Sequence, residues 1–445
     1  MKILFDYTNI NGFHVDGFPD GMTVIMAVTK KAGHDIRYLR IFEKSDYFLV
    51  NETVKEFMPD VVGFTSVSSQ FSVVTDLADI VKKISPKIIN VCGGVHPTMY
   101  PQCVLENKSL DLIFIGDSEY AFLDFLEKLK NNQSWKDCDN IAYNDNGKLK
   151  KNKLKPLLSN EELELLPHPD RTGRAYADTL QHTGVAHFHF TRGCPFTCTY
   201  CSNIGIAKVY GSTRYNIRQA SPEYAVQEME ETIKAHPTIG SVYKVFIVDD
   251  IFGLNKKWRK EFLALYRERI KIPFCCMLRC DAVTEDTMQD LAKSYCSRIQ
   301  FGVESGNDYI RNVVMDREMP RETIVRAFKL ADKYGVETSS LNVIGAPGET
   351  KEMLMDTVKL NREINPTASG ANIFYPYKGT PLGDRSFKEG LVNIEKYNDF
   401  TNERRESVMN YPEKWNDILD TTITSVIEVS ESGQVAVELI AECGW

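Results

Sequence analysis

The sequence predicts an α/β protein with an N-terminal Rossmann or flavodoxin-like sheet, a second parallel sheet of six strand–helix units, and a small C-terminal region. Short apolar runs alternate with amphipathic stretches from Lys2 to about residue 130, and the alternation returns near residue 187. Such alternation is typical of parallel sheets covered by helices. The length of 445 residues also exceeds that of one typical domain.

Residues 1–150 are expected to form the first domain. Its predicted strands are Lys2–Tyr7, Ile36–Ile41, Val61–Val67, Ile88–Val91 and Leu112–Ile115, and its predicted helices are Met22–Lys31, Val73–Ile84 and Tyr120–Leu129. Five such strands fit the flavodoxin-like order, which places a ligand in the crevice beyond their carboxyl ends. Small residues in the turns there let the backbone approach a large flat ligand closely. These turns contain Ser66, Ser68, Gly93, Gly94, Gly116 and Glu119.

Residues 151–185 are predicted to be a linker, because prolines make Leu165–Arg171 rigid and extended. His168 and Asp170 are expected on its solvated surface, with a position facing the substrate as the alternative. Residues 186–382 are expected to form the second domain. Its predicted strands are His187–Thr191, Lys244–Val248, Phe274–Leu278, Arg298–Val303, Ser339–Ile344 and Asn372–Tyr375. Its predicted helices are Pro222–Ala235, Lys256–Ile270, Glu285–Tyr295, Arg321–Tyr334 and Glu352–Ile364.

Composition and charge limit the class of protein. The formal net charge is -8 and no basic run stands out, which disfavours a nucleic-acid partner. Asp6 interrupts the first apolar run, so this run is expected to be a strand and not a signal peptide. No apolar stretch has membrane-spanning length. Cysteines without a secretion signal indicate a reducing compartment, so a cytoplasmic location is expected.

The sequence around residue 194 carries the strongest chemical signal. Cys194, Cys198 and Cys201 follow one another at intervals of four and three residues. A buried helical stripe would have the same spacing, but Gly193 and Pro195 disfavour a helix there. Crowded thiolates need a cation, and structural zinc prefers four ligands, usually in two Cys-x-x-Cys pairs. Three thiolates suit an iron–sulfur cluster with one iron left open.

This motif, with Tyr200 before its last cysteine, resembles that of the radical S-adenosylmethionine (SAM) superfamily. The resemblance implies a 4Fe-4S cluster held by the three cysteines, with SAM chelated to the open iron. It also implies cleavage of SAM to a 5′-deoxyadenosyl radical, an electron donor such as ferredoxin or flavodoxin, and a partial (β/α)₆ barrel. Tyr200 is then expected near the adenine, and the chemistry at the carboxyl ends of the strands.

Further residues at those strand ends are matched to SAM by the same resemblance. Asp249 or Asp250 is expected at the SAM ammonium, with a solvated carboxylate as the alternative. Arg279 is expected at the SAM carboxylate or, alternatively, in a salt bridge to Asp281. The remaining expected contacts are Glu304 and Ser305 at the carboxylate and ribose, Gly345 and Gly348 along the adenine, and Tyr375 as a pocket wall or core residue.

The cysteines of the third barrel strand suggest a second cluster with Cys296. Cys275 and Cys276 are consecutive, however, and successive strand residues face opposite sides of a sheet. These two cysteines and Cys280 are therefore predicted to be core residues.

Residues 1–130 resemble the cobalamin-binding domain of one branch of the superfamily. Many such domains carry Asp-x-His-x-x-Gly after the first strand, with the histidine bound to cobalt. Here Asp16–Gly21 has that spacing, but Phe18 replaces the histidine, and a phenyl ring has no donor atom. Cobalamin without a protein histidine ligand is therefore expected, and the alternative is a sheet that has lost its cofactor. His14 is interpreted as a loop residue, and His96 either contacts the corrin or caps a helix.

The resemblance implies a cobalamin-dependent radical SAM enzyme, most economically a methyltransferase acting on an unactivated carbon or phosphorus of a small molecule. A natural-product, lipid or cofactor precursor fits that description. The alternatives are cyclisation, dehydration or carbon–carbon bond formation with cobalamin idle or absent, and a cobalamin or SAM sensor without turnover. Residues 383–445 are expected to cap the substrate site, with a strand at Val435–Ile440 and an incidental Cys443.

Overall fold

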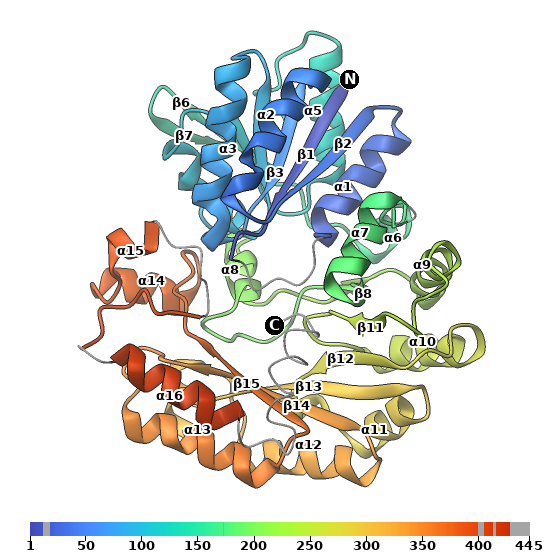
Figure 1. Ribbon diagram of the computed structural model, residues 1–445, viewed down its shortest axis with the longest axis vertical. Helices are drawn as coiled ribbons and strands as arrows, with labels where there is room; N and C mark the ends of the chain where they lie inside the picture. The colour runs from blue at the N-terminus through green and yellow to red at the C-terminus, as the bar shows by residue number, and fades with distance from the viewer. Residues whose placement is uncertain (12–17, 172, 399–404, 413–414, 428–445) are drawn as a thin grey trace.

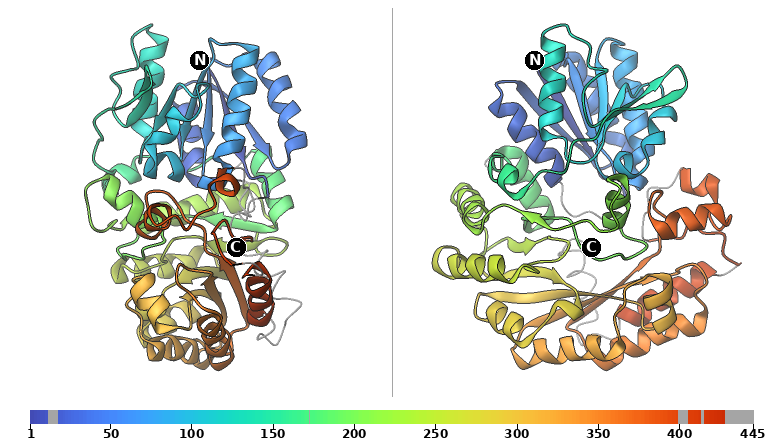
Figure 2. Two further views of the ribbon diagram at one scale, coloured as in Figure 1. Left: turned by 90° about the vertical axis from the view of Figure 1, so that its left-hand side faces the viewer. Right: turned by 180° about the vertical axis from the view of Figure 1, so that it is seen from behind.

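The computed structural model describes residues 1–11, 18–171, 173–398, 405–412 and 415–427. An N-terminal α/β domain lies above a half-barrel of parallel strands, and the helix α8 (Ser202–Val209) lies between the two (Figure 1). Figure 2 shows the same arrangement from the side and from behind. The predicted fold class is confirmed. None of the helices in the described residues is both long and apolar enough to cross a membrane.

The N-terminal sheet has the strand order β2-β1-β3-β4-β5-β6-β7. Its parallel part has the predicted flavodoxin-like order and consists of β1 (Lys2–Thr8), β2 (Asp35–Ile41), β3 (Val61–Thr65), β4 (Ile89–Gly93) and β5 (Leu112–Phe114). The antiparallel hairpin of β6 (Ile141–Asp145) and β7 (Lys148–Lys151) was not predicted. Its turn, Asn146-Gly147, has positive φ at both residues, as two-residue hairpin turns require.

Five α-helices of this domain surround its sheet (Figure 1). They are α1 (Asp20–Lys31), α2 (Tyr47–Phe57), α3 (Phe71–Ile84), α4 (Val95–Met99) and α5 (Glu119–Lys130). Helix α2 was not predicted, although its buried Val50, Val54 and Phe57 recur at helical spacing.

The segment that joins the two domains is more structured than expected. It contains α6 (Asn160–Glu164) and α7 (Arg174–Thr183), and Leu158, Leu163 and Leu166 are buried. The stretch predicted to be extended, Leu165–Arg171, contains neither helix nor strand, but Leu166 and Arg171 in it are buried, and the helices on both sides of it were not predicted. His168 Nδ1 donates to a carboxylate oxygen of Glu231 at 3.0 Å, and its ring packs edge-on against Tyr224.

The half-barrel is a parallel sheet of six strands in the order β15-β14-β13-β12-β11-β8, as predicted. Its strands are β8 (Val185–Phe188), β11 (Lys244–Ile247), β12 (Phe274–Leu278), β13 (Cys296–Glu304), β14 (Glu337–Ile344) and β15 (Ala368–Ile373). The helices that cover its outer side are α9 (Pro222–Ala235), α10 (Lys256–Arg269), α11 (Glu285–Ala292), α12 (Arg321–Lys333) and α13 (Lys351–Ile364). A short π-helix, Ile310–Val314, was not predicted.

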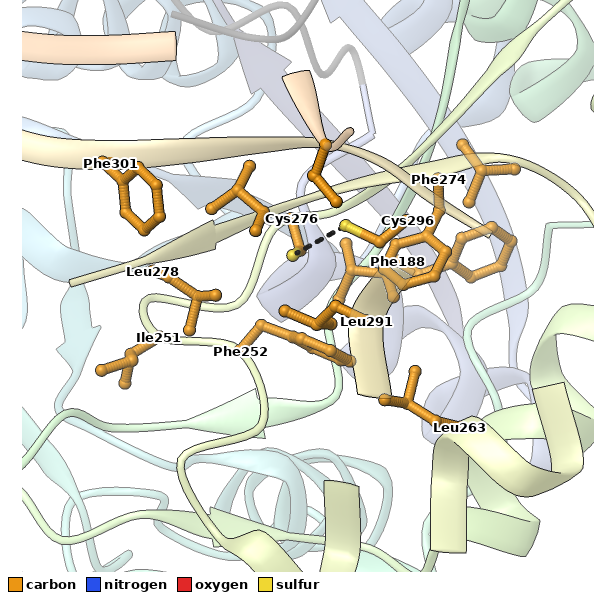
Figure 3. Packing of buried hydrophobic residues seen from close by; sticks show 14 of the residues in the cluster. Phe188, Ile251, Phe252, Leu263, Phe274, Cys276, Leu278, Leu291, Cys296 and Phe301 are labelled. Carbon is orange, nitrogen blue, oxygen red and sulfur yellow. Dashed lines mark hydrogen bonds between the residues drawn. The ribbon is translucent and has the colours of Figure 1, made fainter. Parts of the chain in front are cut away.

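The core between the half-barrel strands and these helices contains two of the cysteines considered for a second cluster. The sulfurs of Cys276 and Cys296 lie 3.9 Å apart among phenylalanine and leucine side chains (Figure 3). Cys275 packs in a separate cluster with Val185 and Phe246. The prediction that these are core cysteines is confirmed.

The described residues of the C-terminal part add three helices to the half-barrel. They are α14 (Pro381–Lys388), α15 (Ile394–Asn398) and α16 (Trp415–Ile427), of which α16 packs on β15 and α13. Lys378, just before α14, reaches the N-terminal domain and lies 4.2 Å from the ring centroid of Tyr100. His14, Asp16, the strand predicted at Val435–Ile440 and Cys443 lie outside the described residues.

Candidate active site

A cavity of about 430 Å³ lies where the carboxyl ends of the N-terminal strands face the carboxyl ends of the half-barrel strands. From the N-terminal domain, its wall includes Gly93 and Gly94 after β4 and Gly116 after β5. From the half-barrel, its wall includes Gly193 of the cysteine loop and Asp250 after β11. The cavity therefore brings the predicted ligand turns of one domain opposite the cysteine loop of the other.

Two glycines of the N-terminal wall, Gly94 and Gly116, occupy conformations and spaces that exclude side chains. Gly94 has φ 100°, and a Cβ there would lie 2.7 Å from Thr65 Oγ1 and 2.8 Å from the Ser66 backbone nitrogen. Gly116 has φ 70°, and a Cβ there would overlap the hydroxyl of Tyr210, the residue that follows α8. The absence of side chains keeps this wall flat, as the approach of a large planar ligand requires.

Several other predicted cobalamin contacts lie away from the cavity wall. Phe18 is buried in the half-barrel core, with its ring 5.0 Å from that of Tyr176. His96 Nδ1 lies 3.0 Å from Ser68 Oγ, and its ring lies 4.6 Å from that of Phe71. Burial lowers the pKa of His96 to about 3, so its imidazole is neutral. Ser66 is also buried, and its hydroxyl donates to the Val67 carbonyl at 2.8 Å.

The three motif cysteines are free thiols on the loop between the short strand β9 (Thr191–Arg192) and α8. Burial is the main cause that raises the pKa of Cys194 to about 11 and that of Cys201 to about 12, and the neighbouring Cys198 contributes to both. Cys194 and Cys201 therefore ionise at neutral pH only beside a cation. No three His, Cys, Asp or Glu side chains of the described chain lie close enough to bind a single metal ion. A cluster binds each cysteine through a different iron, so this thiol set fits a cluster better than zinc.

Two buried arginines lie against the sulfur of Cys198. Arg279 Nη1 lies 3.3 Å and Arg317 Nη1 lies 3.7 Å from Cys198 Sγ. Arg279 also makes the alternative salt bridge to Asp281, at 2.7 Å. Arg317 donates to the hydroxyl of Tyr200 at 2.8 Å and was not identified from the sequence. Cys198 and Tyr200 precede Arg317 by more than one hundred residues, which no local pattern reveals.

The two consecutive aspartates after β11 take different positions. Asp249 is fully buried and accepts hydrogen bonds from the backbone nitrogens of Phe190, at 2.7 Å, and Thr191, at 3.1 Å. Burial raises its pKa to about 6. Asp250 is exposed and lines the cavity. Of the two, only Asp250 is therefore placed to meet a cation in the cavity, while Asp249 fixes the backbone before the cysteine loop.

The turn after β13 brings Glu304 beside the cysteine loop. Glu304 has φ 67° and forms an ion pair with Arg317 at 3.1 Å, so it is linked through Arg317 to Tyr200. Ser305 is buried and its hydroxyl lies 3.5 Å from Thr357 Oγ1 on α13. Glu304 therefore lies within the charged group around the loop, whereas Ser305 joins its turn to a covering helix.

The turn after β14 has positive φ at Gly345 and Gly348, 75° and 82°. Glu349 accepts hydrogen bonds from the backbone nitrogen of Gly345 at 2.6 Å and from that of Ala346 at 3.1 Å, and burial raises its pKa to about 7. Tyr411 of the C-terminal part donates to the Gly345 carbonyl.

Tyr375 is buried, and its ring stacks on Tyr397 at 5.3 Å. Its position is that of a core residue between the half-barrel and the C-terminal helices.

Charged pairs that the sequence did not reveal connect the walls of the cavity. Arg192, directly before the cysteine loop, lies 2.6 Å from Glu119 and 3.4 Å from Asp117 of the N-terminal domain. Burial of Asp117 opposes its ionisation, but Arg192 and Arg218 outweigh it and lower its pKa. Arg171, which is 2% exposed, pairs with Asp20 of α1 at 2.7 Å and with Glu228 of α9.

Comparisons with known proteins agree with this architecture. Residues 188–360 match the family model of the Radical SAM superfamily, and residues 9–126 match that of the B12 binding domain. The chain is 25% identical over 391 residues to an uncharacterized methyltransferase of Pyrococcus horikoshii, covering 86% of this chain and 82% of the relative. It is 27% identical over 425 residues to the anaerobic magnesium-protoporphyrin IX monomethyl ester cyclase of Rubrivivax gelatinosus, covering 90% of this chain and 73% of the relative.

Among solved structures, the fold is similar to that of the radical SAM methyltransferase TsrM from Kitasatospora setae with tryptophan and a SAM analogue bound. The TM-score is 0.72 at 15% identity, over 87% of this chain and 76% of that chain. The chain thus belongs to the radical SAM superfamily, in the branch that carries an N-terminal B12-binding domain. It is a radical SAM enzyme, and the predicted family is confirmed.

Proposed function

We propose that the chain is a cobalamin-dependent radical SAM methyltransferase that acts on an unactivated carbon or phosphorus of a small molecule. The observation that carries the proposal is the single cavity whose walls are the glycine turns of the B12-binding domain and the cysteine loop of the half-barrel. A methyl carrier bound at one wall and a radical source bound at the other would face a common substrate, and such positioning accounts for much of catalysis.

The chain's residues divide between three cofactors in this proposal. Cys194, Cys198 and Cys201 would bind the cluster, and Gly93, Gly94, Gly116 and Glu119 would form the cobalamin wall. SAM would be bound by Tyr200, Asp250, Arg279, Glu304, Gly345 and Gly348. When bound, these cofactors supply the radical and methyl-transfer chemistry, while the protein orients them and excludes water.

Asp250 is the residue that we assign to the SAM ammonium. Its exposed carboxylate lines the cavity, and it acts electrostatically on both Cys194 and Cys201. Asp249 is instead occupied by two backbone nitrogens. Asp250→Asn should therefore weaken SAM binding while leaving the cluster content unchanged.

We also propose that cobalamin binds without a histidine from the N-terminal domain. Within the described part of that domain, the cavity wall contains no histidine, and His96 is neutral and packed beside α3. Corrinoid content after growth with cobalamin tests this. It should be unchanged in His96→Ala and His14→Ala, and its loss in either variant would contradict the proposal.

The reaction is tested by anaerobic reconstitution followed by reduction with dithionite. Wild-type protein should release 5′-deoxyadenosine, and Cys198→Ala should not, while Cys138→Ala provides a control because Cys138 is buried in the N-terminal domain. S-adenosylhomocysteine formed alongside would identify a methyltransferase. A reconstituted protein without iron, or one that never cleaves SAM, would refute the proposal.

A second candidate is a non-methylating radical reaction such as ring formation. The similarity to the cyclase of Rubrivivax gelatinosus favours it. It predicts 5′-deoxyadenosine without S-adenosylhomocysteine, even in corrinoid-loaded protein.

A further inference from the structure

We propose that Arg279 and Arg317 raise the reduction potential of the iron–sulfur cluster by donating N–H groups to the sulfur of Cys198. The inference rests on the proposed function, because it requires the cluster. It concerns two positioning residues that control how readily the cluster accepts the electron needed for SAM cleavage.

The geometry places both guanidinium groups on one cysteine. Arg279 Nη1 lies 3.3 Å and Arg317 Nη1 lies 3.7 Å from Cys198 Sγ. Their exposed fractions are 6% and 5%, and that of Cys198 is 7%. Water therefore competes little for these contacts, and hydrogen bonds from charged donors are about twice as strong as those between neutral groups.

The orientation of Arg279 is fixed by its other contacts. Its Nε and Nη2 atoms donate to Asp281 at 3.0 and 2.7 Å, and Nη2 also donates to the Arg317 carbonyl at 2.8 Å. The ring of Phe196, a residue of the cysteine loop, lies 3.7 Å from the guanidinium carbon. Arg279 thus presents its remaining Nη1 to Cys198.

Arg317 is fixed in a comparable way. Its Nη2 donates to the Gly302 carbonyl at 2.7 Å, and its Nη1 contacts Glu304 at 3.1 Å and Tyr200 at 2.8 Å. Neither arginine can therefore leave the sulfur without breaking several buried hydrogen bonds.

The charge around the three cysteines is uneven. Cys198 contacts two guanidinium groups, whereas the carboxylate of Asp250 acts on Cys194 and Cys201, and Arg279 also acts electrostatically on Cys194. The closest polar side chain to Cys201 that the described contacts include is the neutral amide of Asn203, at 3.6 Å. Reduction makes the cluster more negative, and hydrogen bonds to its sulfurs stabilise that state, so the arginines should raise the potential.

A purely structural role would leave the potential unchanged. Arg279 also connects its own turn to the segment of Arg317 through the hydrogen bond to the Arg317 carbonyl, and the loss of this buried contact lowers stability and cluster content. The reduction potential of the clusters that a variant still binds distinguishes the structural role from the proposed one, because this potential does not depend on the fraction of protein that contains a cluster.

The test is a redox titration of the reconstituted full chain without SAM, followed by electron paramagnetic resonance of the reduced cluster. Arg279→Gln and Arg317→Gln should each lower the ratio of reduced to oxidised cluster at a fixed potential by at least about tenfold, which corresponds to about 59 mV for one electron. Arg279→Lys retains a cation, so it should lower the ratio of reduced to oxidised cluster by less than Arg279→Gln does. It replaces Arg279→Gln in the test if the glutamine variant fails to fold.

Arg298→Gln is the matched control. Arg298 is also buried and paired with a carboxylate, Glu337, but it lies six residues before Glu304 on β13, which is roughly 20 Å along a strand. The cluster in the Arg298→Gln variant should have the same reduction potential as the cluster in the wild type. The inference is overturned if the Arg279 and Arg317 variants keep the wild-type potential, or if Arg298→Gln shifts as much. A wild-type chain that binds no cluster would instead refute the proposed function.

Discussion

Gly94→Ala is the substitution that most directly tests the proposed cobalamin wall. Gly94 has φ 100° and ψ -173°, a region that is essentially restricted to glycine. Occupying it with another residue costs on the order of 1–3 kcal/mol. The new Cβ would also lie 2.7 Å from Thr65 Oγ1 and 2.8 Å from the backbone nitrogen of Ser66, so the turn itself must move.

Gly93→Ala is the control, because it changes the adjacent residue of the same wall. Its Cβ would meet no atom within 4 Å, so stability should change by less than about 0.5 kcal/mol. Thermal unfolding of the corrinoid-free full chain measures the difference. Each kcal/mol should lower the Tm of the N-terminal domain by roughly 2–4 °C.

Cobalamin titration then separates strain from ligand contact. Both glycines line the cavity, so both alanine variants should bind cobalamin more weakly. Only Gly94→Ala should have a lower Tm than the wild type. Equal Tm values for the two variants would refute the claim that the Gly94 backbone conformation excludes a side chain. Unchanged cobalamin affinity in both would show that cobalamin binds elsewhere.

Three further predictions concern the cysteine loop, the contact between the domains, and Glu349. Cys198→Ala should lose the iron–sulfur absorption and all 5′-deoxyadenosine, whereas unchanged SAM cleavage would contradict the cluster assignment. Arg192→Gln leaves the buried Glu119 unpaired and should weaken cobalamin retention about tenfold or more, with the exposed Arg214→Gln as control. Burial raises the pKa of Glu349 to about 7 from 4.5, so the folded chain binds the extra proton. Glu349 should therefore lower the free energy of unfolding progressively as the pH rises from about 4.5 to 7, by up to about 3 kcal/mol in total. Glu349→Gln should remove this fall from the plot of unfolding free energy against pH.

The sequence predicted the strands well because buried parallel strands are short apolar runs. Phe274–Leu278 and Pro222–Ala235 were predicted with the observed bounds, and the helix starts where the Ser221 side chain accepts a hydrogen bond from the Tyr224 backbone nitrogen. Asn146-Gly147 is also a strong local signal, but no helix or strand was predicted between Leu129 and the linker that was expected to begin at residue 151.

The site was predicted where chemistry is local and missed where it depends on distant partners. The cysteine spacing sufficed for the cluster loop, whereas Arg317 meets Cys198 across 119 residues of sequence. Strand alternation had excluded a shared site for Cys275 and Cys276. Asp249 and Asp250 follow the end of β11, where alternation does not apply, so both aspartates were kept as candidates until the hydrogen bonds from Phe190 and Thr191 to Asp249 distinguished them.

The ion pairs around the cavity have a role beyond the stability of the fold. Arg171 and Arg192 each join the two domains through carboxylates that line the cavity, and both pairs are largely buried. Removing one partner of such a pair is strongly unfavourable, although the intact pair stabilises little compared with apolar packing. Charged contacts are therefore suited to fixing how the domains face each other. A reaction that needs a methyl carrier on one wall and a radical source on the other depends on that geometry, because an error of 1 Å in position can lower a rate about a hundredfold.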